Sequence, residues 1–122
     1  MPNILFDPTM RGLSQGLTLH QQRHEVLASN LANVETPGYR ARELEFGAAL
    51  KDAFRGGEGI EAALPETEVV ADRTAPSRAD GNTVDVDLQM AKLGANGGRY
   101  IALAKLLGHR VTMLRQAIEG TR

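Results

Sequence analysis

The chain has 122 residues, the size of a single domain, which leaves no room for a separate catalytic domain. Its 14 Lys and Arg against 15 Asp and Glu leave it almost neutral, so neither nucleic acid nor an anionic membrane is expected as its main partner. Without cysteine there is no disulfide framework and no thiolate metal site. No apolar run approaches the roughly 20 residues of a membrane span, so we expect no direct membrane insertion.

The first predicted element is a helix over residues 9–36. Asp7 or Thr9 can cap its start, and Pro37 followed by Gly38 ends it. Apolar residues and two histidines recur along it at steps of three and four, as in the seam of a helix that packs along its length. This seam consists of Met10, Leu13, Leu17, His20, His24, Leu27, Leu31 and Val34.

Residues 37–82 form an insert between two long helices. A possible short helix covers residues 46–55, and residues 68–70 are a possible short strand. Alone, this segment could not bury enough apolar surface to hold a fixed shape. We therefore expect it to lean on the helices or on neighbouring subunits.

The last predicted element is a helix over residues 83–119. Asn82 or Thr83 can cap it, and Asp85 and Asp87 place negative charge at the positive end of its dipole. Its spacing repeats that of the first helix, beginning with Leu93, Gly97, Tyr100 and Ala104. The side chains that we expect on its assembly seam are Tyr100, Leu103, Leu106, Leu107, Val111, Leu114 and Ile118.

Both helices carry more apolar surface than one partner can cover. On the last helix the apolar arc spans roughly 240°, where a single-faced helix needs about 100°. On the first helix, Leu19 and Val26 form a smaller patch away from the seam. The extra partners are most simply other copies or homologues of the chain. The glycines at 94, 97 and 98 weaken the last helix and indicate either a mild kink or a close helix contact.

Together these elements predict a single, all-α-dominated domain. The long N- and C-terminal helices pack as an antiparallel coiled-coil hairpin, and an irregular, partly extended insert joins them.

Two patterns resemble metal sites, and each has a simpler explanation. His20 and His24 are four residues apart, but no Glu follows to complete a zinc motif, so packing or a hydrogen bond across the helix pair is preferred. Residues 80–87 are rich in Asp but lack the closing Glu of a calcium loop, so helix capping is preferred. We find no phosphate loop and no nucleophile set, and we expect no enzyme activity, cofactor or metal.

Residues 28–42, ASNLANVETPGYRAR, resemble the N-terminal signature of the bacterial flagellar rod and hook family. Residues 80–93 and the closing helix resemble the B-type proximal rod proteins within it. The C type carries a proline where this chain has residues 84–87, Val-Asp-Val-Asp. The turn that carries the family motif consists of Asn30, Leu31, Ala32, Asn33, Thr36, Pro37, Gly38 and Tyr39.

This resemblance implies a structural subunit of the basal-body rod, which transmits torque from motor to hook and filament. The implied partners are copies of itself, homologous proximal and distal rod proteins and the rod-to-membrane-ring adaptor, with transient contact to the flagellar type III export apparatus. It also implies a periplasmic rod location reached without a cleaved signal peptide. The first residues indeed lack the pattern of such a signal.

The motif residues also suggest specific contacts. Asn30 and Asn33 should hydrogen-bond the backbone of the turn from Thr36 to Tyr39, because buried amides are rarely unpaired. We expect Tyr39 to anchor an interface. The alternative function, from a different class, is a cytoplasmic helical-hairpin adaptor or export chaperone that binds one client along its apolar face.

Overall fold

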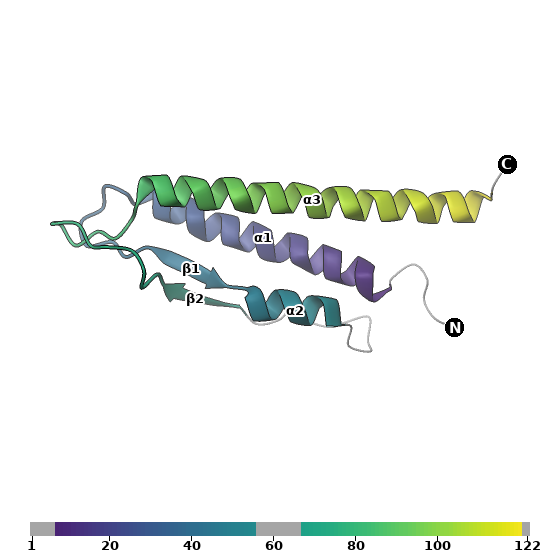
Figure 1. Cartoon of the computed structure of the whole chain (residues 1–122), viewed down its shortest axis with the longest axis horizontal. Coiled ribbons are helices and arrows are strands. Elements are labelled where there is room, and N and C mark those ends of the chain that lie inside the picture. The colour runs from purple at the N-terminus through teal and green to yellow at the C-terminus, as the bar shows by residue number, and fades with distance from the viewer. Residues whose placement is uncertain (1–6, 56–66, 121–122) are drawn as a thin grey trace.

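The computed structural model describes residues 7–55 and 67–120. Figure 1 shows three layers, with the N-terminal helix between the C-terminal helix on one side and the strands and short helix on the other. The two long helices run in opposite directions. The elements are α1 (Pro8–Ala32), β1 (Arg42–Glu45), α2 (Gly47–Arg55), β2 (Glu68–Ala71) and α3 (Val86–Glu119). This arrangement confirms the predicted helical hairpin with an insert.

Helix α1 begins one residue before the predicted start and ends earlier than predicted. The carboxylate of Asp7 accepts a hydrogen bond from the backbone N–H of Met10 (2.8 Å), which makes Asp7 the N-cap, and Pro8 occupies the first turn. The helix ends at Ala32 with Asn33 as its C-cap, four residues short of the predicted end at 36. The residues that follow form a turn that a distant segment of the chain holds in place, as described below.

Helix α3 begins at Val86, three residues later than predicted. Its N-cap is Asp85, whose carboxylate accepts from the backbone N–H of Leu88 (3.1 Å), rather than Asn82 or Thr83. The side chains of Asn82 and Thr83 instead bind the turn after α1 and are not available for capping. The predicted end at residue 119 agrees with the structure.

The glycines of α3 neither interrupt the helix nor pack against another element of the described chain. The helix is continuous from Val86 to Glu119 (Figure 1). A Cβ atom added at Gly94, Gly97 or Gly98 would meet nothing within 4 Å. The close helix contact considered at these positions is therefore not made by the described part of this chain.

The insert contains more regular structure than the sequence indicated. Helix α2 and strand β2 match the predicted helix over 46–55 and the strand over 68–70. Strand β1 was not predicted; it pairs with β2 in antiparallel register, with Arg42 opposite Ala71. Residues 56–66, which belong to the predicted insert, lie outside the described residues.

The apolar core lies between α1 and the insert. Leu19 is completely buried, on a helix that contacts α2, β1 and α3. The second patch predicted on α1 is therefore buried by this chain itself at Leu19, which corrects the expectation that a neighbouring copy covers it. The buried hydrophobic residues are Leu13, Leu19, Leu27, Ala41, Leu44, Ala49, Ala53 and Val84.

The seam between α1 and α3 differs in register from the predicted one. Gln89 and Asn96 are the only buried residues of α3. Leu103, Leu107 and Leu114 are half-buried, in agreement with the predicted seam. On α1, Leu13 and Leu27 are buried and Leu17 and Leu31 half-buried, as is Val34 in the following turn.

Four predicted seam residues of α3 are exposed instead: Tyr100, Leu106, Val111 and Ile118. Within the described chain α1 does not bury them, and the buried positions of α3 are Gln89 and Asn96 instead. Ile118 is 73% exposed, and Ile101 and Met113 add to the exposed apolar surface of α3. The wide apolar arc predicted for this helix is thus largely uncovered. Within the described residues, no helix combines the length and apolar character needed to cross a membrane.

Candidate functional site

The motif residues 30–39 surround the turn that follows α1, and Asn30 is its best-connected member. Its side chain is completely buried. The amide nitrogen donates to the backbone oxygen of Arg42 (2.6 Å) and to Oε1 of Gln89 (3.1 Å). The amide oxygen accepts from the backbone N–H of Arg42 (2.9 Å) and from the hydroxyl of Tyr39 (3.2 Å). Asn30 thereby uses its full hydrogen-bonding capacity and ties α1, β1 and α3 together.

Asn33 acts within the turn. Its amide nitrogen donates to the backbone oxygen of Ser29 (2.8 Å), and its amide oxygen accepts from the hydroxyl of Thr36 (3.1 Å). The prediction that Asn30 and Asn33 bind the backbone of the turn from Thr36 to Tyr39 is wrong. Their backbone partners are Arg42 and Ser29, and the turn contributes only the hydroxyl groups of Tyr39 and Thr36. The interface role of Tyr39 stays a prediction.

A second, distant asparagine closes this turn. The buried amide nitrogen of Asn82 lies 2.8 Å from the backbone oxygen of Thr36 and 3.0 Å from those of Asn33 and Val34. Its amide oxygen accepts from the backbone N–H of Val84 (2.7 Å). Carbonyl groups just beyond a helix end need hydrogen-bond donors, and here one side chain from the far end of the insert provides them.

Backbone contacts join the same two segments. The N–H of Gly38 donates to the oxygen of Asp80 (2.9 Å), and the N–H of Thr83 donates to the oxygen of Tyr39 (3.0 Å). Gly38 and Gly81 have φ values of 72° and 81°, a conformation that side chains strongly disfavour. We call residues 33–41 and 78–84, which these bonds connect, the turn clamp.

Next to the turn clamp, an ion network connects all three layers. The guanidinium of Arg23 on α1 binds Glu43 on β1 (2.9 Å), and Lys92 on α3 binds both Glu43 and Asp72 (3.1 Å each). The side chain of Asp72 is only 7% exposed. The guanidinium of Arg23 also lies 5.0 Å from the centre of the Phe46 ring.

The network shifts the ionisation of its members. Burial by itself would raise the pKa of Glu43, but hydrogen bonds from Arg23 and Lys92 outweigh it and hold the pKa below the ordinary value of 4.5. Thr74 and Lys92 likewise outweigh burial at Asp72 and hold its pKa below 3.8. Burial would lower the pKa of Lys92, but its two carboxylate partners raise it above 10.5.

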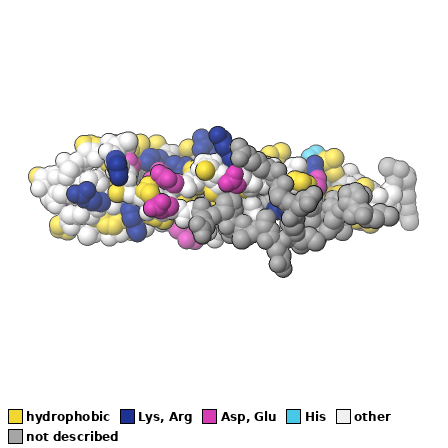
Figure 2. Space-filling view, turned by 90° about the horizontal axis from the view of Figure 1, so that it is seen from below, with side chains coloured by type: hydrophobic (Ala, Val, Ile, Leu, Met, Phe, Trp, Pro, Cys, Tyr) yellow, Lys and Arg dark blue, Asp and Glu magenta, His cyan; other side chains and the backbone are white. Residues whose placement is uncertain are grey.

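The surface over the insert has no single sign of charge. On the face shown in Figure 2, acidic and basic side chains are interspersed. This pattern agrees with the near-neutral composition and with charges that pair with one another.

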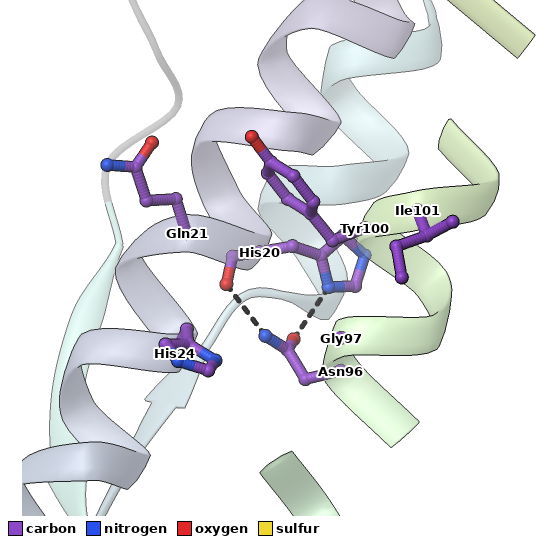
Figure 3. A pocket seen from close by; sticks show the side chains of 7 residues that line it. All are labelled: His20, Gln21, His24, Asn96, Gly97, Tyr100 and Ile101. Carbon is purple, nitrogen blue, oxygen red and sulfur yellow. Dashed lines mark hydrogen bonds between the residues drawn. The ribbon is translucent and has the colours of Figure 1, made fainter. Parts of the chain in front are cut away.

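The two histidines considered as metal ligands are used differently. His20 is 2% exposed, and its Nδ1 lies 2.7 Å from Oδ1 of Asn96, while the amide nitrogen of Asn96 donates to the backbone oxygen of His20 (2.8 Å). Figure 3 shows both bonds joining α1 to α3 beside a groove of about 310 Å³, lined also by Tyr100 and Ile101. His24 is exposed. The predicted hydrogen bond across the helix pair is thus present at His20. No group of three metal-ligating side chains is found among residues 7–55 and 67–120.

Several of these residues were missed in the sequence. Gln89 and Asn96 are seven residues apart and continue the seam through Leu103 and Arg110. This heptad register can be recognised in the sequence only when polar residues are allowed at seam positions. Nothing local marks Asn82 or Glu43 as partners of α1, because their contacts depend on chain segments 20 to 49 residues away.

Comparison with known proteins adds the family to this geometry. A model for flagella basal body rod protein matches residues 10–40, which include most of α1 and the motif turn. The flagellar basal body rod protein FlgB of Cereibacter sphaeroides strain ATH 2.4.9 is 36% identical over an alignment covering 88% of this chain and 91% of the relative. FlgB of Escherichia coli K12 is 32% identical, covering 93% and 96%. FlgB of Salmonella typhimurium is 30% identical, covering 93% and 95%.

The chain belongs to the flagellar basal-body rod protein family. As a member of the rod family it is a structural component of the flagellum, located in the basal body and assembled with other rod proteins. The alignments reach beyond the motif into the insert and α3, so the resemblance identified at residues 28–42 extends to nearly the whole chain.

Proposed function

We propose that the chain is a subunit of the proximal rod that transmits torque from the motor to the hook and filament. Its periplasmic position follows export through the flagellar type III apparatus without removal of a signal peptide. The subunit carries out no catalysis. Its partners are copies of itself, homologous proximal and distal rod proteins, and the adaptor between the rod and the membrane ring.

One observation supports this proposal best: a structural protein with rod-family sequence leaves the apolar side of its longest helix uncovered. Ile101, Leu106 and Met113 are each more than half exposed. Apolar surface of this extent on a small protein is typical of an interaction site. In our proposal, neighbouring subunits cover this side of α3, and Tyr39 and the motif turn contribute to the same contacts.

The test is complementation of a flagellated host that lacks its own copy of the gene. The variant Ile101→Ser with Leu106→Ser should retain wild-type helicity, because neither side chain is buried, but should reduce swimming at least about tenfold and yield few complete rods. Lys105→Ser, at an exposed position between them, is the matched control and should swim normally. Normal swimming of the double variant would contradict the proposal.

Subcellular location separates the rod subunit from the adaptor or chaperone. Antibody detection in purified hook–basal bodies is expected for a rod subunit. Recovery only in the cytoplasm, bound to one client protein, would favour the alternative.

A further inference from the structure

Apolar residues alone do not select one side of α3 for contact with α1. Its buried residues are Gln89 and Asn96, and Leu103, Leu107 and Leu114 on the same side are half-buried. Other apolar residues, Met90, Ile101, Leu106 and Met113, are at least 51% exposed. Because burial of apolar surface is the main driving force of helix pairing, apolar side chains this widely distributed leave the rotation of the helix undetermined.

Two polar contacts distinguish one side of the helix from the others. His20 and Asn96 exchange a pair of hydrogen bonds, and Asn30 donates to Gln89. These four residues are each at most 2% exposed. Turning α3 would leave the polar groups of α1 buried against apolar side chains, and a buried polar group without a partner is costly.

We propose that these two contacts, His20–Asn96 and Asn30–Gln89, set the rotation of α3 about its own axis. They keep Gln89 and Asn96 against α1 and leave Ile101, Leu106 and Met113 exposed. A single polar residue in a helix seam can fix the arrangement of a coiled coil at some cost in stability, and here the same principle selects a helix face. The rotation of α3 is a property of the isolated chain. Only the binding of neighbouring subunits to its exposed residues rests on the proposed function.

Burying these polar groups costs free energy of folding, so their role is not simply to stabilise the helix pair. The amide nitrogen Nε2 of Gln89 is buried and has no hydrogen-bond partner among the described residues. A leucine would avoid this cost and could pack against α1. The polar side chain therefore gives up stability where an apolar seam would suffice to hold two helices together.

The absence of cysteine makes a disulfide test straightforward. A Cβ atom added at Gly16 would lie 3.2 Å from Cδ1 of Leu103, so Gly16→Cys with Leu103→Cys reports the observed face. Residue 101 lies about 200° around the helix from residue 103, so Gly16→Cys with Ile101→Cys reports the turned face. Each pair is introduced into the full chain, and the yield of intramolecular disulfide is measured together with the helical circular dichroism signal.

In the chain with both contacts intact, the 16–103 yield should exceed the 16–101 yield at least about tenfold. His20→Leu leaves the side-chain oxygen of Asn96 without its partner and should reduce this ratio several-fold while the helical signal is kept. Adding Asn96→Leu removes the contact completely, so the ratio should stay reduced. His20→Gln, which can still hydrogen-bond Asn96, is the matched control and should keep the original ratio.

Three results would overturn the proposal. The first is a ratio near one in the chain with both contacts intact, and the second is an unchanged ratio in His20→Leu. The third is loss of the helical signal in His20→Leu, because His20–Asn96 would then be needed for the pair to form rather than for the choice of face. None of these results depends on rod assembly, so they leave the proposed function to its own test.

Discussion

Among the motif residues, Asn30 makes the most side-chain hydrogen bonds. Asn30→Ala would leave both backbone groups of Arg42, the oxygen of Gln89 and the hydroxyl of Tyr39 without their partner. Since each buried unpaired group costs about 1–3 kcal/mol, we expect a loss of at least about 3 kcal/mol in the free energy of unfolding. Denaturant unfolding followed by circular dichroism measures it.

Asn33→Ala provides the comparison for this prediction. Asn33 is half-buried and its side chain bonds Ser29 and Thr36, so loss of this side chain should cost about 1 kcal/mol. Equal losses for the two alanine variants would show that the burial and connections of Asn30 do not matter.

Replacing glycine by alanine should change the free energy of unfolding in opposite directions at two positions. Gly38 has a φ of 72° and open space around it, so Gly38→Ala adds only conformational strain and should destabilise the chain by about 1–2 kcal/mol. Gly97 lies inside α3, also with open space, so Gly97→Ala should stabilise the chain by about 1 kcal/mol. Thermal unfolding of both variants checks the signs, and a stabilising Gly38→Ala would refute the argument.

At the scale of elements, the ion network predicts how the attachment of the insert depends on pH. The folded-state pKa of Glu43 lies below 4.5, so its contribution to stability is present above pH 4.5 and is lost as the pH falls through the folded-state value. Lys92 behaves in the opposite direction: its contribution is present below pH 10.5 and is lost as the pH rises through its raised pKa.

Glu43→Gln tests the acidic limb of this dependence. At pH 7 it should cost about 2 kcal/mol, the range for hydrogen bonds to charged groups, and the difference from wild type should shrink as the pH falls below 4.5. Urea unfolding at a series of pH values measures it. The same substitution at the exposed Glu45 is the control, and a difference that is constant with pH would contradict the network.

In the whole molecule, the core that stabilises the fold and the apolar end of α3 proposed for assembly lie in different parts of the chain. The buried hydrophobic residues all belong to α1, the insert or the segment before α3. The end of α3 beyond Arg110, whose guanidinium contacts Asp7, contains none of them. Stability should therefore depend little on this end of the helix, even though it carries exposed apolar residues.

A chain that ends at Arg110 should accordingly unfold within about 1 kcal/mol of the full chain, whereas Leu19→Ala should cost about 3 kcal/mol. In the complementation assay the shortened chain should nevertheless fail to support swimming. Strong destabilisation by the truncation, in the same denaturant experiment, would place the core elsewhere.

Local signals in the sequence define the elements and indicate the family. Helical spacing, caps and prolines act over a few residues, so the two long helices, α2 and β2 could be predicted from them. Motif residues 28–42 were enough to indicate the rod family, which the relatives confirmed. The exact ends of α1 and α3 were less predictable, because Asn82 belongs to the turn clamp and does not cap its neighbouring helix.

Which helix faces meet depends on contacts between distant parts of the chain. The apolar arc of α3 is too wide to single out one side, and the side that α1 selects is marked by the buried amides of Gln89 and Asn96. Likewise, Leu19 looked available to a neighbour until α1 was seen to lie between α3 and the insert. Such choices depend on hydrogen bonds and burial between residues far apart in the chain, which local spacing does not encode.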